Sequence, residues 1–227
     1  MMDTWRGVRI VYEDNHLLVV VKPPNMPTQA DQSGDEDLQN AMKSYLANRY
    51  QKRGAVYLGL VHRLDRPVGG LVVLARTSKA AERLSSQVRQ KTLSRVYLTV
   101  VRGCTPEHAE LRDYLLKDER TNTVKTVEPD TPGGKEAILA YDRISAQGKF
   151  SLLKVKLFTG RSHQIRVQLS HAGFPIWGDA RYGQGKPGEQ IALWGAYMGL
   201  VHPTLKNEMH FEALPPAADP WSRFRMD

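Results

Sequence analysis

The sequence has a single cysteine, Cys104, and no long apolar run. One cysteine cannot form a disulfide within the chain, and this scarcity is typical of proteins from a reducing compartment. Residues 1–6 contain no apolar segment like that of a secretory signal, and the longest apolar runs are far too short to span a bilayer. We therefore expect a soluble, cytoplasmic protein that does not associate with membranes.

Several common catalytic patterns are missing as well. Gly133-Gly134-Lys135 lacks the earlier glycine and the following Ser or Thr of a phosphate-binding loop. The histidines form no His-Glu-x-x-His motif and no cysteines are paired, so we expect no metal and no other cofactor. A glycosidase of the two-carboxylate type would need a second acid near Asp65, and the motifs show none.

Acidic residues are scarce in one segment of the chain. Lys and Arg outnumber Asp and Glu by 32 to 24, which gives a net charge of +8. Residues 49–102 hold 12 of the basic residues but only two acids, Asp65 and Glu82. A basic block of this kind predicts contact with a phosphate backbone, although a solvated helix face with scattered arginines would give the same composition.

The length of 227 residues suits one large domain or two small ones. We find no internal repeat, low-complexity tract or linker, and predict a single domain over residues 1–227 that acts as a monomer. Runs of β-type residues outnumber helical patterns and show no βαβ alternation. This predicts an α+β fold with a mostly antiparallel or mixed sheet.

The predicted strands lie at 8–12, 17–22, 57–61, 71–75, 94–101, 111–116, 135–144, 150–158, 191–200 and 208–211. Apolar residues at helical spacing predict a helix with Leu38, Ala41, Met42, Tyr45 and Leu46 on its buried face. Two further helices are expected to begin at Ser78 and Ser162, each with that serine as the N-cap.

The most distinctive stretch is His-Arg-Leu-Asp-Arg-Pro-Val-Gly-Gly at residues 62–70. Pro67 and the two glycines favour a loop, and apolar runs on both sides predict buried strands. Asp65 would then be a carboxylate among arginines on a loop held by two strands, which is a good position for chemistry. The alternative is a turn aspartate that caps a backbone amide and pairs with a neighbouring arginine.

Four stretches resemble the RluA-type pseudouridine synthase family and follow one another in the same order as in that family. One is the loop motif at 62–66 with its glycines; another precedes it in the chain and two follow it. They are Tyr-Glu-Asp-Asn-His-Leu-Leu-Val-Val-Val-Lys-Pro-Pro at 12–24, Gly-Arg-Ser-His-Gln-Ile-Arg at 160–166, and Pro-Ile-Trp-Gly-Asp at 175–179 with Arg-Tyr-Gly at 181–183. The resemblance covers about residues 8–215.

The resemblance implies the pseudouridine synthase fold, a long central sheet with flanking helices and a cleft across it, here without the S4-type RNA-binding domain that some relatives carry. It also implies an enzyme that isomerises uridine in ribosomal or transfer RNA. By resemblance Asp65 is the essential catalytic carboxylate, Arg166 pairs with it, and Tyr97 stacks on the target base and helps to move its proton. Arg63 matches the residue that fills the space left by the flipped uridine.

The remaining candidates are substrate-binding residues. We expect Arg66 to bind substrate. Phosphate or cleft contacts are open to Arg161 and His163, and the alternative for each is a surface or capping role. His62 stands beside the loop, where packing or hydrogen bonding suits it better than acid–base work. Lys91 is a further possible phosphate contact. The chain departs from the family at residues 68–70, where Val-Gly-Gly replaces the usual Thr-Ser-Gly and removes two hydroxyl groups that could steady the loop.

Two other functions fit the same residues. A catalytically silent RNA-binding or chaperone protein would keep the basic residues, and a nucleoside glycosidase would release free uracil. The intact Asp65, Tyr97 and Arg166 favour the isomerase. The sequence leaves open which RNA and which uridine are modified, and whether Asp65 attacks the sugar, attacks the base or removes a sugar proton.

Overall fold

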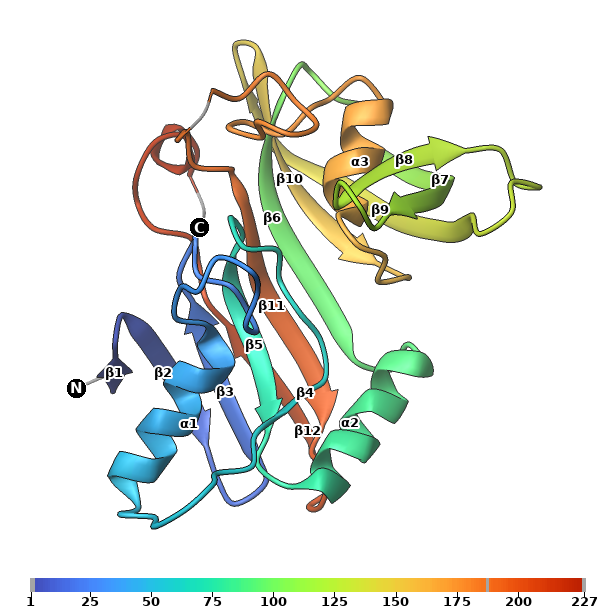
Figure 1. Cartoon of the computed structure of the whole chain (residues 1–227). Coiled ribbons are helices and arrows are strands. Elements are labelled where there is room, and N and C mark those ends of the chain that lie inside the picture. Colours follow the sequence, from blue (N-terminus) through green and yellow to red (C-terminus); the bar gives the residue numbers. More distant parts are fainter. Residues whose placement is uncertain (1–2, 187, 226–227) are drawn as a thin grey trace. The chain divides into compact units, whose positions relative to one another are not determined.

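The computed structural model describes residues 3–186 and 188–225. In these ranges the chain forms twelve β-strands, three α-helices and one short 3-10 helix, so the predicted α+β class is confirmed (Figure 1). The backbone divides into two compact units. Unit 1 comprises the described parts of 1–95 and 195–214, and unit 2 those of 96–194 and 215–227.

Unit 1 is built on a sheet in the order β1-β2-β3-β5-β11, with β4 also beside β5 and β12 beside β11. The pairs β1–β2, β2–β3, β3–β5, β4–β5 and β11–β12 are antiparallel. Every residue of β3 and β5 is buried, which explains their unbroken apolar sequences. The strands are β1 (Thr4–Trp5), β2 (Val8–Glu13), β3 (Leu17–Lys22), β4 (Gly59–Leu60), β5 (Gly69–Ala75), β11 (Leu193–Val201), which enters unit 1 at Gly195, and β12 (Glu208–Glu212).

Two helices belong to unit 1. Helix α1 (Leu38–Arg49) starts after Asp37, whose side chain accepts a hydrogen bond from the backbone N–H of Asn40. All five residues predicted for its inner face are buried. Helix α2 (Ser78–Arg89) has Thr77 as its N-cap, one residue before the predicted Ser78, because the Thr77 hydroxyl accepts the N–H of Ala80.

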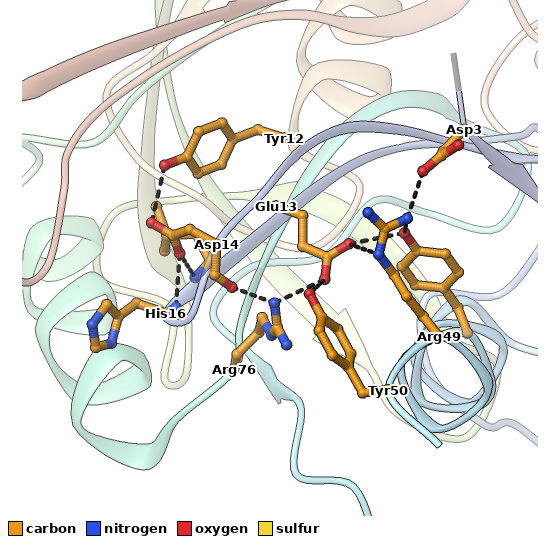
Figure 2. Close-up of polar contacts among 10 residues, drawn as sticks. Asp3, Tyr12, Glu13, Asp14, His16, Arg49, Tyr50 and Arg76 are labelled. Atoms are coloured by element: carbon orange, nitrogen blue, oxygen red, sulfur yellow. Dashed lines mark hydrogen bonds and ion pairs between the residues drawn. The ribbon is translucent and has the colours of Figure 1, made fainter. Parts of the chain in front are cut away.

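A polar network joins α1 to the sheet of unit 1 (Figure 2). The Glu13 carboxylate, at the end of β2, accepts hydrogen bonds from the hydroxyls of Tyr45 at 2.8 Å and Tyr50 at 2.6 Å and from the guanidinium of Arg76 at 2.8 Å. The Glu13 and Arg76 side chains are nearly buried, so each charge compensates the other where water cannot. The network fixes helix α1 against the end of β2 and against Arg76, which directly follows β5.

Unit 2 contains a second run of strands in the order β6-β10-β9-β7-β8. All four neighbouring pairs are antiparallel. Helix α3 (Gln164–His171) lies beside β7 and β8 (Figure 1). The strands are β6 (Ser94–Arg102), β7 (His108–Asp118), β8 (Thr123–Val127), β9 (Lys135–Gln147) and β10 (Phe150–Leu157).

The structure differs from the sequence-based expectation at a few elements. The predicted buried strand at 57–61 is only the two-residue β4, which pairs with the end of β5, and Tyr57 is half exposed. Strands β1 and β8 were not predicted. Both are short, and β8 (Thr123–Val127) has polar residues at three of its five positions, so it shows no apolar run.

Candidate active site

The loop at 61–68 joins β4 to β5 and carries Asp65. Its side chains alternate in burial: Leu64 and Val68 are buried, Asp65 is half buried, and Arg63 and Arg66 are exposed. The N–H of Val68 donates to the carbonyl of Asp65 at 3.0 Å and closes a turn. The carboxylate thus sits between two apolar anchors that hold its backbone in place.

Gly70 matches the glycine of the family's Thr-Ser-Gly, and its surroundings require a glycine at this position. Its φ of +122° lies in the region that side chains rarely adopt, and a Cβ at this position would lie 2.4 Å from the backbone N and O of Gly195 in β11. The two strands approach each other here without side chains between them. Val68 and Gly69, which stand where the family has Thr and Ser, are not among the residues that make this contact.

Two buried polar residues, both missed by the sequence analysis, bind the loop backbone from the end of β3 and from the segment that follows it. The Thr28 hydroxyl donates to the Leu64 carbonyl at 2.7 Å and accepts the Leu64 N–H at 3.3 Å. The Lys22 ammonium donates to the carbonyls of Arg66 at 3.1 Å, Pro23 at 3.1 Å and Met26 at 2.7 Å. Backbone on both sides of Asp65 is therefore fixed by side chains from one neighbouring segment.

Lys22 is fully buried, which is unusual for a lysine. Burial lowers the pKa of its ammonium to about 7, the negative charge of Asp65 opposes that fall, and the positive charge of Arg66 adds to it. The signal in the sequence was a lysine at the end of an apolar strand, before Pro23-Pro24. It was visible as part of a family motif but gave no indication of its contact with the loop.

The two loop arginines have different surroundings. Arg63 is exposed, and its side chain makes no hydrogen bond or ion pair with any of the residues the structure describes. Arg66 instead pairs with Asp35, and lies 3.8 Å from Asp31, in the acidic segment before α1. Arg63 is thus the loop cation available to a phosphate or a base.

His62 is buried, and its Nε2 accepts the N–H of Val73 in β5 at 3.1 Å. Nδ1 must then carry the proton of the neutral ring, and it has no partner among the described residues. Burial, assisted by the charge of Arg95, lowers the pKa of His62 to about 3, so the ring is neutral at physiological pH. This geometry agrees with the packing role expected for His62.

Unit 2 holds the other candidates. Tyr97 lies on β6 opposite Val155 of β10 and is 7 % exposed. The next four residues of the strand, 98–101, are buried too, on both of its faces. The sequence alternates here, with Val96, Leu98 and Val100 on one face and Arg95, Tyr97 and Thr99 on the other, which predicts an apolar and a polar face. That prediction is wrong, because Thr99 is as buried as Leu98 and Val100. Alternation cannot reveal a strand that is covered on both sides.

Arg166 is buried in α3 and held by the carboxylate of Asp179. Its Nε donates to Oδ2 and its Nη2 to Oδ1, both at 2.8 Å, which is a bidentate pair. The guanidinium also lies over the ring of Tyr182 at 5.1 Å. Burial would raise the pKa of Asp179, but the bonds and charge of Arg166, with backbone N–H donors, lower it below its usual value.

Helix α3 is fixed by glutamines rather than by an apolar stripe alone. The Gln164 amide donates to Ile138 O and to the amide oxygen of Gln168, and that of Gln168 donates to Leu111 O, Ala137 O and the carboxylate of Asp113. These bonds attach the helix to backbone carbonyls of β7 and β9. The predicted Ser162 cap is wrong, because His163, with φ +52°, occupies the N-cap position and makes no side-chain capping bond.

Arg161 and His163 are both engaged within unit 2. The Arg161 Nε donates to the carbonyl of Glu136 at 2.9 Å, although the side chain remains exposed. The His163 Nδ1 lies 2.6 Å from the hydroxyl of Tyr182, which also accepts the N–H of Val124. Lys91 has φ +60° and follows the end of α2.

Unit 1 therefore gathers His62, Arg63, Asp65 and Arg66 on one loop, and unit 2 gathers Arg161, His163 and Arg166 around α3 with Tyr97 on β6. Among the described residues no group of three or more His, Cys, Asp or Glu could hold a metal ion. None of the helices in the described part of the chain is long and apolar enough to cross a membrane.

Comparison with known proteins agrees with this arrangement of motifs. A family model described as RNA pseudouridylate synthase matches residues 16–171. The chain is 33 % identical over 224 residues to ribosomal large subunit pseudouridine synthase D of Zymomonas mobilis, with 92 % of this chain and 69 % of that protein covered. It is 32 % identical to the mitochondrial tRNA pseudouridine(32) synthase of Saccharomyces cerevisiae, with 86 % and 40 % covered.

The fold is also similar to that of a solved structure. The structure of human RNA pseudouridylate synthase domain containing 4 superposes with a TM-score of 0.76 at 20 % identity, covering 91 % of this chain and 88 % of the other. The pseudouridine synthase fold predicted from the motifs is confirmed. The chain belongs to the RNA pseudouridylate synthase family, of the RluA type, and is an isomerase that acts on RNA.

Proposed function

We propose that this chain converts specific uridines of ribosomal or transfer RNA to pseudouridine, with Asp65 as the essential carboxylate. The observation that carries the proposal is the construction of the 61–68 loop. Thr28 and Lys22 hold the backbone on either side of a half-buried Asp65, and the exposed Arg63 stands beside it. Relatives named for ribosomal RNA and for transfer RNA support both substrate classes.

The reaction is an isomerisation with no net co-substrate, and we propose that side chains alone carry it out. The bond from ribose C1′ to uracil N1 breaks, the base turns, a bond from C1′ to C5 forms, and the C5 proton leaves while N1 takes a proton. Asp65 acts at the first stage, by attack on the sugar or the base or by removal of a sugar proton. Tyr97 stacks on the detached base and helps to move the C5 proton.

The target uridine is flipped out of the RNA, since the reacting atoms are inaccessible within a stacked strand. Arg63 fills the vacated space. Its exposure and its lack of a partner among the described residues suit this role. Arg166 pairs with the ionised Asp65, and its rigid attachment to Asp179 suits a group that must hold one orientation.

The remaining candidates support binding. Arg66 and Arg161 are exposed cations that can contact RNA phosphates, while His62 and His163 serve the substrate indirectly by holding the loop and α3. We further propose that the protein is cytoplasmic and acts as a monomer; light scattering of the purified protein tests the monomeric state.

The test uses RNA labelled with tritium at uridine C5. Incubation of ribosomal and transfer RNA with the purified chain is expected to release tritium and to form pseudouridine at defined positions. Binding without release would support an RNA-binding protein instead, and free uracil detected by chromatography would identify a glycosidase. Mapping of pseudouridines in RNA from cells with and without the gene then identifies the sites.

A further inference from the structure

We propose that Asp179 and Tyr182 are positioning residues that fix the guanidinium of Arg166 in the orientation needed for the isomerisation. The inference rests on the proposed function, because it gives Arg166 its role beside the catalytic carboxylate. The contacts that support this inference all lie within unit 2. They involve two side chains, Asp179 and Tyr182, for which the sequence indicated no role.

Asp179 holds Arg166 within the plane of the guanidinium. Two parallel bonds of 2.8 Å engage Nε and Nη2, the inner edge of the group, and leave Nη1 outside this pair. A bidentate pair of this kind restricts both the position and the rotation of the guanidinium. Both side chains are almost fully buried, at 7 % and 1 % exposure, so water does not compete for these bonds.

Tyr182 restricts the remaining direction, perpendicular to that plane. The Arg166 guanidinium carbon lies 5.1 Å from the centre of the Tyr182 ring. The ring is itself fixed, because its hydroxyl accepts the N–H of Val124 at 2.9 Å and lies 2.6 Å from Nδ1 of His163. Arg166 is thus held in its plane by one residue and across its face by another.

The two holding residues are joined by a single turn. Oδ1 of Asp179, besides the Arg166 bond, accepts the backbone N–H of Arg181 at 2.9 Å and of Tyr182 at 3.2 Å. Glycine is required beside this turn, since a Cβ on Gly178 would lie 2.2 Å from the Gln190 carbonyl oxygen. The segment 178–182 is therefore a rigid piece of backbone that presents a carboxylate and a ring to the same guanidinium.

The first variant is Asp179→Asn. Asparagine keeps an oxygen for the N–H groups of Arg181 and Tyr182, so the turn survives, but its amide replaces the oxygen that accepted Arg166 Nε. The matched control is Asp113→Asn, which removes a partly buried carboxylate bonded at 2.7 Å to Gln168 of the same helix without touching Arg166. A general effect on α3 would make the two variants alike.

We expect Asp179→Asn to lower kcat by about 10²-fold with KM changed little, because misplacement of a reacting group acts on the chemical step. Asp113→Asn is expected to keep kcat within about threefold of the wild type. In an Arg166→Met background, Asp179→Asn should cause no further loss, because its effect passes through Arg166. Equal losses in the two single variants, or a full additional loss in the Arg166→Met background, would overturn the inference.

A second pair covers the case in which Asp179→Asn does not fold. Tyr182→Phe and Tyr182→Leu both lose the hydroxyl, but only leucine also loses the ring. The phenylalanine variant is expected to keep most of the kcat of the wild type, and the leucine variant to lose about tenfold more, because the face contact is gone. Equal kcat values for the two variants would contradict the role of the ring.

A structural measurement separates this inference from the proposed function. In NMR spectra the Arg166 Nε–H should exchange slowly with solvent in the wild type and much faster in Asp179→Asn, with no such change in Asp113→Asn. An active wild type with an unaffected Nε–H in Asp179→Asn overturns only the inference. A wild-type protein that releases no tritium from any RNA overturns the proposed function, and the inference with it.

Discussion

Lys22 is the residue whose chemistry depends most closely on that of Asp65. It is buried, it donates to three carbonyls, and one of these belongs to Arg66, next to the carboxylate. A neutral amine has only two hydrogens to donate, so loss of the proton leaves one carbonyl without its partner. Protonation of Lys22 and the order of the loop are therefore coupled.

We predict that Lys22 titrates near pH 7 rather than near its usual pKa of 10.5. Asp65→Asn should lower the pKa of Lys22 further, because it removes the charge that opposes the effect of burial, and Arg66→Gln should raise it. NMR titration of the Lys22 ammonium measures both shifts. A pKa near 10.5 that neither substitution moves would show that Lys22 does not sense the loop.

The lowered pKa of Lys22 also makes the free energy of unfolding depend on pH. Between about pH 7 and about pH 10.5 the unfolded chain holds a proton at Lys22 that the folded chain has lost, so this residue makes the free energy of unfolding rise with pH across that window. Lys22→Met should remove that slope, which chemical denaturation at several pH values would show.

At the scale of elements, the loop depends on the close contact of β5 with β11 at Gly70 and Gly195. We predict that Gly70→Ala costs about 3 kcal/mol or more of unfolding free energy, since it combines a strained φ with a Cβ 2.4 Å from backbone atoms. Gly54→Ala is the control, because Gly54 has a similar φ of +115° and nothing within 4 Å of its Cβ position.

Urea denaturation of both variants separates the two causes. The Gly54 variant should lose only about 1–2 kcal/mol, the strain of the backbone alone. If Gly70→Ala were no less stable than Gly54→Ala, the approach of the two strands would not constrain the loop as described.

The sequence predicted an element well where its pattern of apolar residues continued unbroken along most of its length. The helical spacing from Leu38 to Leu46 gave the buried face of α1 correctly, and β3 and β5 were recognised as apolar runs. It failed where tertiary contacts decide the structure. Tyr97 and Thr99 are buried on what the alternation marked as a polar face, because both faces of β6 are covered.

The candidate site was predictable only in part, for the same reason. Asp65, Arg63 and Arg166 stood in recognisable motifs, but a motif does not state which side chains meet. Thr28, Lys22 and Asp179 act through partners 36, 44 and 13 residues away, and such pairs leave no local pattern. Gln164 and Gln168, polar residues on the inner side of α3, even contradict the usual rule that this side is apolar.

At the scale of the whole molecule, the net charge of +8 is the property most relevant to RNA. We predict that RNA affinity falls steeply with salt. Arg63→Gln should reduce the slope of log K against log salt concentration by about 0.7–0.9, because a cation that fills the space of the flipped uridine offsets the charge of about one backbone phosphate. Titrations at several salt concentrations measure this.

Arg112→Gln provides the control, because Arg112 is an exposed cation already paired with Glu136 at 2.6 Å and near Glu110 at 3.6 Å. Its loss should leave the salt slope almost unchanged. If both substitutions lowered the slope equally, Arg63 would be one surface charge among many rather than a contact of the bound RNA.

The most direct measurement of the central claim compares tritium release from C5-labelled RNA by the wild type, Asp65→Asn and Asp35→Asn. Both substitutions remove one carboxylate from unit 1, but Asp35 is exposed and paired with Arg66. We predict that Asp65→Asn abolishes release, to below about 10⁻³ of the wild-type rate, while still binding RNA, and that Asp35→Asn keeps most of the activity. Release by Asp65→Asn at the wild-type rate would contradict the account.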